Sequence, residues 1–228
     1  MKRVKTSNSR VPNLHLNRIQ PLTANQVKMF EAENDVVAHG SAGTGKTLVG
    51  TYIGLRDIIV NKKYKRLVYI RSAVPTRNMG FLPGTDKEKA EVYELPYREI
   101  ATFLFDDVNA YDKLKAQGTV VFMTTSFIRG TTLDDCVIIV DECQNMNMHE
   151  LDTIITRTGE NSRIFFCGDM YQSGDLGNEK SGIGEFFAVL RKMDEFDFIE
   201  FKIEDVVRGP RVKNYLTARW KQHESSNQ

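Results

Sequence analysis

Short apolar runs alternate with amphipathic stretches along most of this 228-residue chain. The apolar runs predict buried strands, and the stretches between them have the three-to-four-residue apolar spacing of helices. The predicted strands cover residues 35–39, 66–71, 119–124, 136–142, 162–169 and 196–202. The predicted helices cover residues 23–32, 48–60, 87–105, 148–158, 181–193 and 210–220, with a short helix and turn over 106–118. This alternation predicts an α/β fold with a mostly parallel sheet sandwiched by helices and joined by right-handed crossovers.

The two ends of the chain are polar and predict little buried structure. We expect residues 1–13 to form a flexible arm, residues 14–220 to form one domain, and residues 221–228 to form a disordered tail. Pro96 is expected to kink or split the helix that contains it. Glycine and proline bracket an apolar pair at residues 80–84, which indicates a structured loop with a functional role.

A glycine-rich segment follows the first predicted strand and fits the pattern G-x-x-x-x-G-K-T. It consists of Gly40, Ser41, Ala42, Gly43, Thr44, Gly45, Lys46 and Thr47, and Leu48 begins the next helix. The strand, glycine loop and helix together are typical of a P-loop, whose backbone N–H groups and helix N-terminus bind phosphates. Lys46 would contact the β and γ phosphates, and the Thr47 hydroxyl would ligate Mg²⁺. The pattern therefore predicts ATP and Mg²⁺ as ligands of residues 40–48.

A second group of polar residues follows two of the later strands. Asp141 and Glu142 end the apolar run of residues 136–142, and Asp169 ends the next strand. Asp141 would hold Mg²⁺ through a water, and Glu142 would activate the water that attacks the γ-phosphate. Two solvated carboxylates at a strand end are the alternative. Gln172 follows Asp169 and could contact the γ-phosphate, although an ordinary turn explains the same residues equally well.

Composition narrows the classes of function further. The net charge of +1 gives no bulk attraction for nucleic acid, so any such binding needs a local basic patch. Three cysteines, Cys136, Cys143 and Cys167, lack the pairing of a disulfide framework or a zinc ribbon and are expected to be reduced, partly buried thiols. The sequence contains neither a secretory signal nor an apolar run long enough for a bilayer, so we expect a cytoplasmic protein without a membrane partner.

Together these residues resemble the PhoH-like P-loop ATPases, in particular the small stand-alone members that bacteriophages carry. The resemblance extends over residues 22–219. It rests on residues 40–47, 71, 80–84, 129–130, 132–133, 141–145, 156–159, 168–169, 172 and 205–208. It implies a single RecA-like P-loop NTPase domain related to the first motor domain of superfamily 1 helicases.

The resemblance also implies roles for individual side chains. Gln26 would read adenine, although a glutamine on a helix is otherwise a surface residue. Gln144 and Gln172 would lie near the γ-phosphate. Arg208 would act as an arginine finger or sensor, with a surface ion pair as the alternative. Arg71, Arg129 and Arg157 are open between a functional and a structural role. The predicted catalytic set is therefore Lys46, Glu142, Gln172 and Arg208.

Two functions from different classes remain open. One is a motor-like ATPase acting on RNA or single-stranded DNA, in a homo-oligomeric ring that the resemblance suggests is a hexamer. A neighbouring subunit would then complete the cleft and present Arg208 in trans. The other is a regulatory or scaffold ATPase that hydrolyses ATP without unwinding nucleic acid. A small-molecule kinase would need a lid and an acceptor pocket, which the Asp141–Glu142 pair does not require.

Overall fold

The computed structural model describes residues 3–5, 14–72, 86–169 and 182–226. Within them, six parallel strands form one sheet in the order β5-β4-β6-β7-β3-β8. The strands are β3 (Asp35–Gly40), β4 (Arg66–Arg71), β5 (Val120–Thr124), β6 (Cys136–Asp141), β7 (Arg163–Gly168) and β8 (Phe196–Phe201). The six strands predicted from the apolar runs are therefore confirmed. The P-loop strand β3 and the acid-bearing strand β6 lie on either side of β7.

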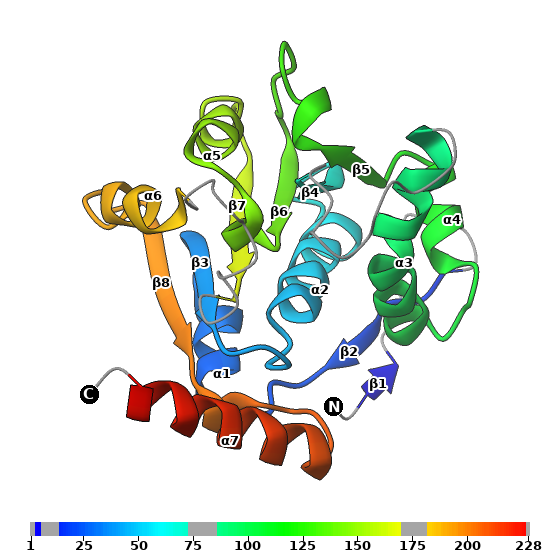
Figure 1. Cartoon of the computed structure of the whole chain (residues 1–228). Coiled ribbons are helices and arrows are strands. Elements are labelled where there is room, and N and C mark those ends of the chain that lie inside the picture. The colour runs from blue at the N-terminus through cyan, green and yellow to red at the C-terminus, as the bar shows by residue number, and fades with distance from the viewer. Residues whose placement is uncertain (1–2, 6–13, 73–85, 170–181, 227–228) are drawn as a thin grey trace.

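Helices cover both faces of this sheet (Figure 1). On one face lie α1 (Ala24–Glu31), α2 (Lys46–Ile59), α3 (Asp86–Phe105) and α4 (Ala110–Ala116), and on the other lie α5 (Met148–Ile155) and α6 (Ile183–Leu190). Each face has its own apolar core, and every residue of β6 and β7 is buried between the two. This burial is typical of parallel strands covered on both sides. None of the helices in the described ranges combines the length and apolar character needed to cross a bilayer.

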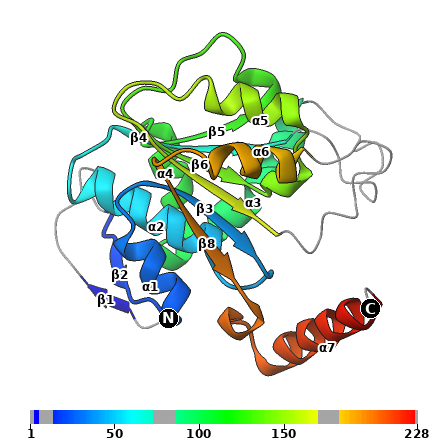
Figure 2. The ribbon, with the colours of Figure 1, turned by 90° about the vertical axis from the view of Figure 1, so that its left-hand side faces the viewer.

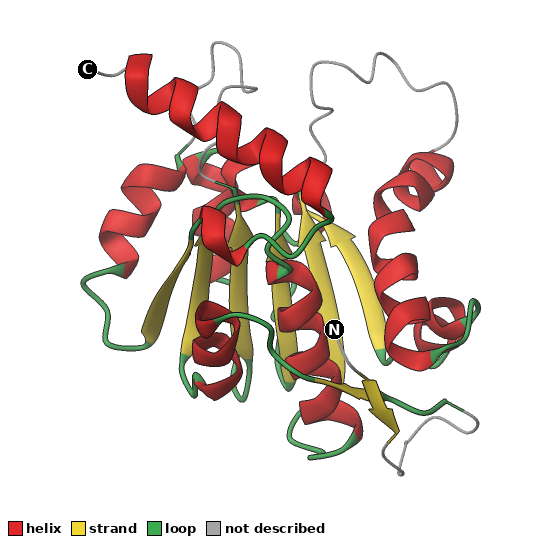
Figure 3. Cartoon of the chain, turned by 90° about the horizontal axis from the view of Figure 1, so that it is seen from below, coloured by secondary structure: helices red, strands yellow, loops and turns green. Residues whose placement is uncertain are grey.

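The carboxyl ends of the strands meet at one edge of the sheet, where α7 (Pro210–Ser226) crosses (Figure 3). Register brings the expected site residues together there, because Asp141 of β6 pairs with Cys167 of β7 and His39 of β3 pairs with Gly168. Short 3-10 helices follow three strands at this edge: η1 (Thr125–Phe127), η2 (Cys143–Asn145) and η4 (Ile203–Asp205). Parallel sheets bind their ligands at this edge, so we expect the ligand site there.

Two features at the ends of the chain differ from the sequence-based predictions. Residues Arg3–Lys5, expected within a flexible arm, form β1 and pair antiparallel with β2 (Asn17–Ile19). Leu16 and Ile19 are buried, which anchors β2 and gives the arm a strand to pair with. The last helix was expected to end near residue 220 but continues to Ser226, because no glycine or proline follows to stop it.

The helix that contains Pro96 is also not split. α3 runs as one helix from Asp86 to Phe105 with Pro96 inside it. Proline removes one backbone hydrogen bond and crowds the preceding turn, at a cost of about 3 kcal/mol. Tyr97 and Leu104 are fully buried after it, and this packing holds the second half of the helix in line with the first.

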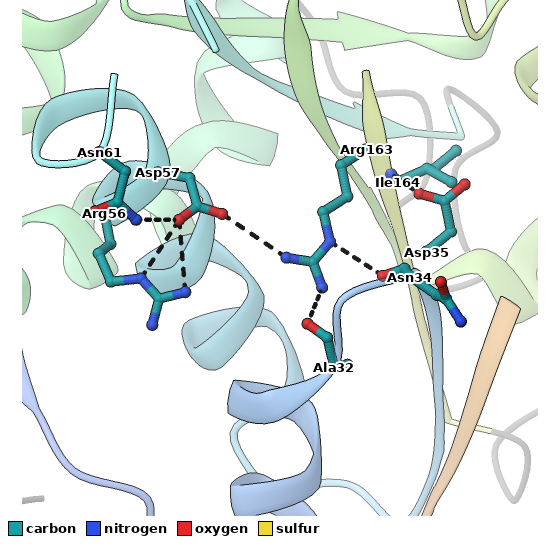
Figure 4. Close-up of polar contacts among 8 residues, drawn as sticks. All are labelled: Ala32, Asn34, Asp35, Arg56, Asp57, Asn61, Arg163 and Ile164. Atoms are coloured by element: carbon teal, nitrogen blue, oxygen red, sulfur yellow. Dashed lines mark hydrogen bonds and ion pairs between the residues drawn. The ribbon is translucent and has the colours of Figure 1, made fainter. Parts of the chain in front are cut away.

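A buried ion pair closes the opposite, amino-terminal end of the sheet (Figure 4). A guanidinium nitrogen of Arg163 lies 3.7 Å from Oδ2 of Asp57, and both side chains are less than a tenth exposed. Arg163 also donates to the carbonyl oxygens of Ala32 at 2.6 Å and Asn34 at 3.1 Å, while Asp57 accepts from Asn61 at 2.7 Å. Because an unpaired buried charge is costly, this network fixes α2 and the turn before β3 against the start of β7.

Candidate nucleotide site

A cavity of about 620 Å³ opens at the carboxyl edge of the sheet, a size typical of small-ligand sites. The predicted site residues that line it are Gln26, Ala42, Gly43, Thr44, Gly45, Lys46, Thr47, Leu48, Asp141, Glu142 and Arg208. Gly40 and Ser41 do not line it, but their carbonyl oxygens accept hydrogen bonds from Lys46. Gln172 and the loop of residues 80–84 lie outside the described residues. Residues that are far apart in the chain therefore line one cavity.

The loop needs glycine for two reasons: neighbouring backbone atoms approach it closely, and a phosphate must reach its backbone N–H groups. At Gly40, where φ is +117°, an added Cβ would lie only 2.0 Å from the carbonyl oxygen of Phe201 on β8. The next amide, that of Ser41, donates to the same oxygen at 2.8 Å. Gly45 has φ of +83° and is the N-cap of α2, so the helix begins at the mouth of the loop. The loop is thus pinned to β8 at one end and to a helix N-terminus at the other.

Lys46 is held inside the loop by backbone oxygens. Its Nζ donates to the carbonyl oxygens of Ser41 at 2.7 Å and Gly40 at 3.3 Å, and the residue is only 8% exposed. Burial lowers the pKa of Lys46, and the negative charge of Asp169 is the largest effect that opposes this. A charged ammonium group in a buried loop favours an anionic ligand, since phosphate oxygens would supply the missing negative charge.

Asp141 is held by two hydroxyl groups from different helices. Thr47 Oγ1 donates to Oδ1 at 2.7 Å, and the phenol of Tyr97 donates to Oδ2 at 3.0 Å. Burial and the nearby Glu142 raise the pKa of Asp141, while the hydrogen bonds from Thr47 and Tyr97 oppose that rise. Tyr97 has no signal in the sequence, because its place on α3 looks like any core position of an amphipathic helix.

These groups fit a magnesium ion. A buried carboxylate next to a second carboxylate favours a cation, and hydroxyl and carboxylate oxygens are the ligands that Mg²⁺ prefers. Thr47 and Asp141 would hold the ion, whose remaining ligands would be water and phosphate. Among the described residues, no three or more His, Cys, Asp and Glu side chains form a larger metal-binding cluster.

Glu142 occupies a strained backbone position directly after β6. Its φ of +52° lies in the left-handed region, which non-glycine residues adopt rarely and at some cost. Gln144, only 1% exposed, donates from Nε2 to Glu142 Oε2 at 2.5 Å. The Oε1 atom of Gln144 accepts from the backbone N–H of Asp169 at 3.0 Å. Gln144 therefore connects the carboxylate of Glu142 to the end of β7.

Gln26 lines the cavity, and both polar atoms of its amide are hydrogen-bonded to backbone groups. Its Nε2 donates to the carbonyl oxygen of Thr44 at 2.8 Å, and its Oε1 accepts from the N–H of Leu22 at 2.8 Å. Thr23 caps α1, as the sequence predicts, by accepting from the N–H of Gln26 at 3.3 Å. The adenine contact implied by the family resemblance would use the second N–H of Nε2 and the second lone pair of Oε1, or an exchange of these bonds. In this structure its amide ties α1 to the P-loop.

Arg208 lies in the cavity of its own chain, whereas a neighbouring subunit was expected to receive it. The backbone N–H of Val207 donates to the carbonyl oxygen of Gly43 at 3.1 Å. A Cβ added at Gly43 would lie 2.9 Å from Cγ of Arg208. The hydrogen bond from Val207 to the P-loop is the physical reason for this placement in cis, and no pattern in the sequence indicates it.

The segment before Arg208 is fastened to α1. Asn25 Nδ2 donates to Asp205 Oδ2 at 2.7 Å, and the backbone N–H of Lys202 donates to the same oxygen at 2.9 Å. Burial opposes ionisation of Asp205, but hydrogen bonds from Asn25, Thr23 and backbone amides lower its pKa overall. The ionised carboxylate therefore acts as a clamp that fixes η4 and, through it, Arg208.

The other three candidate arginines differ in whether they line the cavity. Arg71, at the end of β4, lines the cavity, and its guanidinium lies 5.7 Å from the ring centre of Tyr93. Arg129 and Arg157 are not among the lining residues, and Arg129 contacts the ring nitrogen Nε2 of His149 at 2.8 Å. The described part of the cavity thus holds three cationic side chains, those of Lys46, Arg71 and Arg208.

The arrangement of sheet, P-loop and strand-end acids defines a P-loop NTPase domain with a RecA-like core. A family model described as "PhoH-like protein" matches residues 18–219, so the chain belongs to the PhoH family. The family predicted from the sequence motifs is confirmed.

Individual relatives agree with this assignment. The chain is 31% identical over 204 residues to a PhoH-like protein of Mycobacterium leprae, covering 88% of this chain and 58% of the relative. It is 33% identical over 194 residues to a PhoH-like protein of Bacillus subtilis, covering 83% and 60%. The chain thus spans somewhat more than half the length of these relatives. A large terminase from a thermophilic bacteriophage has a distantly similar structure, with a TM-score of 0.48 and 12% identity over 86% of this chain and 50% of the terminase.

Proposed function

We propose that this domain binds ATP with Mg²⁺ and hydrolyses its terminal phosphoanhydride bond. One observation supports this above the others: a single cavity brings together Lys46, the hydrogen-bonded pair Thr47–Asp141, and Glu142 held by Gln144. These are the groups that phosphoryl transfer to water needs, namely phosphate positioning, metal binding and a base for the nucleophile.

Each residue has a defined part in this proposal. Lys46 would exchange its carbonyl partners for the β and γ phosphates. Glu142 would accept a proton from the attacking water, and Gln144 would hold the Glu142 carboxylate in place for that transfer. Mg²⁺ bound by Thr47 and Asp141 would neutralise charge on the phosphates. Gln172 remains our candidate for a side chain that senses the γ-phosphate.

Arg208 is the proposed stabiliser of charge that develops on the transferred phosphoryl group. It lines the cavity next to Gly43 of its own P-loop, so it can act in cis. Arg71 would add a second positive charge on the side of β4. ATP is proposed as the nucleotide, and Gln26 stays the candidate for base recognition.

We further propose that hydrolysis is coupled to RNA or single-stranded DNA in a ring of identical subunits. The observation that favours assembly is α7, a long helix with none of its described side chains buried. A regulatory ATPase without nucleic-acid unwinding is the second candidate, and the net charge of +1 favours it, because no bulk positive field attracts a nucleic acid.

Phosphate release from Mg-ATP by the purified protein tests the proposal, measured with and without single-stranded RNA and DNA. Glu142→Gln and Lys46→Ala should each lower turnover at least about 100-fold. Glu160→Gln, at an exposed acid just before β7, is the matched control and should keep wild-type turnover. Stimulation by nucleic acid would support the motor, and turnover indifferent to it would support the regulatory ATPase. Turnover that survives Glu142→Gln would overturn the assigned chemistry.

A further inference from the structure

The C-terminal helix α7 is an apolar and basic surface that its own domain leaves uncovered. It follows η4 and stands off the rest of the chain in Figure 2. Val212 is 45% exposed and Tyr215 is 64% exposed. Together with Leu216 and Arg219 they are spaced i, i+3, i+4 and i+7, which places them in one stripe along the helix. An exposed apolar stripe of this kind indicates a contact surface.

The charge of α7 restricts what it can contact. Between Pro210 and Ser226 the helix has four basic residues and one acidic residue. The basic residues are Arg211, Lys213, Arg219 and Lys221. A complementary surface would therefore combine apolar area with acidic side chains.

The chain contains such a surface on α3 and the turn that follows it. An open hollow of about 620 Å³ is lined by Leu95, Arg98, Glu99, Thr102, Phe103, Asp106 and Val108. Leu95 is 54% exposed and Val108 is 75% exposed, so two large apolar side chains face solvent there. The charged residues that line it are Glu99, Asp106 and Arg98. The surrounding residues 91–116 contain six acidic and three basic residues, and three of the acids form ion pairs with those basic residues. The hollow is thus apolar with a small excess of acidic residues, which complements the apolar and basic surface of α7.

The two surfaces are formed by different elements: α7 crosses the carboxyl edge of the sheet, and the hollow lies on α3 and the turn after it. α7 follows β8, one edge strand, whereas α3 and α4 lie beside β5, the other edge strand. Figure 1 shows α7 running away from α3 toward the side of α6. A contact between α7 of one copy and the hollow of another is therefore head-to-tail, the type of contact that can close into a ring.

We propose that α7 of one copy of this chain docks in the α3 hollow of the next copy, which rests on the ring assembly of the proposed function. The contact would link two nucleotide cavities. Arg208, which lines one cavity, lies two residues before the start of α7. Glu99 and Phe103 line both the hollow and the cavity of the copy that receives the helix. Each interface would therefore lie between two bound nucleotides, one beside the start of α7 and one beside the hollow that receives it.

Sedimentation velocity of the full chain tests the proposal with two double variants. One, Val212→Ser with Tyr215→Ser, removes the apolar stripe of α7. The other, Leu95→Ser with Val108→Ser, removes the apolar part of the hollow. Val189→Ser, at a 47% exposed residue of α6 away from both surfaces, is the control. Circular dichroism melting of every variant checks that the fold is kept.

We expect the wild type and the Val189→Ser control to assemble beyond a dimer, and each double variant to raise the dissociation constant at least about 30-fold. The decisive sample is the 1:1 mixture of the two double variants. One retains an intact hollow and the other an intact α7, so the mixture should form a dimer and nothing larger.

Other outcomes would overturn the docking model. A folded mixture that stays monomeric, an α7 variant that assembles like the wild type, or a monomeric wild type would each do so. Loss of RNA binding by the α7 variant with assembly unchanged would assign the helix to nucleic acid instead. Phosphate release is measured separately on the same samples. Turnover by a monomeric wild type would leave the hydrolysis proposal standing while it removes the docking proposal.

Discussion

Tyr97 donates a hydrogen bond from its phenol to Oδ2 of Asp141 at 3.0 Å, which connects α3 to the end of β6. Tyr97 is fully buried, and its ring stacks on that of Tyr69 with the centres 4.0 Å apart. Thr47 occupies the other oxygen of Asp141. Two hydroxyl groups therefore orient the carboxylate, and one comes from a helix outside the P-loop unit. Residues that orient a metal ligand in this way tune the affinity of the metal.

Tyr97→Phe removes only the hydroxyl group and should weaken the response to Mg²⁺. We expect the Mg²⁺ concentration for half-maximal binding of a fluorescent ATP analogue to rise about tenfold. Titration of Mg²⁺ at fixed nucleotide measures this without turnover. Tyr69→Phe is a matched control, because that hydroxyl bonds Thr51 at 3.1 Å instead of Asp141. Equal shifts in both variants would show that the tyrosine pair acts through packing alone.

Gln144→Leu should separate catalysis from nucleotide binding. It keeps the size of the side chain but releases Glu142, so we expect phosphate release to fall roughly 10- to 100-fold. The affinity for ADP should change less than about twofold, since Gln144 holds the base and not the diphosphate. Single-turnover kinetics and calorimetry with ADP measure the two quantities.

The partly exposed neighbour Asn145 supplies the control as Asn145→Leu, which should leave turnover close to that of the wild type. A loss of ADP affinity in Gln144→Leu as large as its loss of turnover would contradict the positioning role. It would instead place Gln144 among the nucleotide contacts.

The sequence predicted the parts of the site that depend on local pattern. Glycine spacing between a strand and a helix predicted the P-loop, and apolar runs ending in acids predicted Asp141 and Glu142 at one edge of the sheet. Parallel strands bring their carboxyl ends together, so this much follows from order along the chain. The six strands and their helices followed in the same way from apolar spacing.

The contacts between distant segments were beyond such patterns. Tyr97 and Asp141 are 44 residues apart, and Gln144 and Asp169 are 25 apart. Their hydrogen bonds depend on the relative placement of α3, β6 and β7, which no spacing within one element encodes. The placement of Arg208 in the cavity of its own chain depends on hydrogen bonds of the same kind, from Val207 to the P-loop and from Asn25 to Asp205. Gln172 lies outside the described residues and stays a prediction.

Arg163→Met should be the most destabilising of the charge-removing substitutions in the fold. It keeps the apolar stem but removes the buried cation, so that the partly exposed Arg56 at 3.5 Å is the cation left to Asp57. The carbonyl oxygens of Ala32 and Asn34 also lose their donor. Breaking a buried pair in this way typically costs about 3–5 kcal/mol. For a domain of this size the expected fall in melting temperature is roughly 6–20 °C. Differential scanning calorimetry measures it.

The exposed ion pair of Lys65 and Asp135 offers the contrasting case. Lys65→Met should change stability by less than about 1 kcal/mol, because solvent screens an exposed pair. Similar losses in Lys65→Met and Arg163→Met would show that the burial of the Arg163 network has no energetic consequence.

His39 should make the fold sensitive to mild acid. It lies in β3 just before the P-loop, and its ring centre is 5.8 Å from that of Phe187 and 6.3 Å from that of Phe198. Burial lowers the pKa of His39, and the charge of Glu200 partly opposes this. The folded protein therefore binds the proton less readily than the unfolded chain, whose histidine titrates near about pH 6.5. The contribution to stability is complete above that pH and is lost as the pH falls through it toward the lower value of the folded state.

His39→Phe fills the same aromatic site without a titratable group and should reduce this acid sensitivity. We expect the fall in melting temperature between about pH 8 and about pH 5.5 to be smaller in the variant than in the wild type, by roughly 1–3 °C. His149→Phe, at an exposed histidine on α5, is the matched control and should retain the wild-type fall. Melting curves across that range decide the matter. If His39→Phe loses as much stability in acid as the wild type, the sensitivity arises elsewhere, and His39 contributes to the strand only as an aromatic ring.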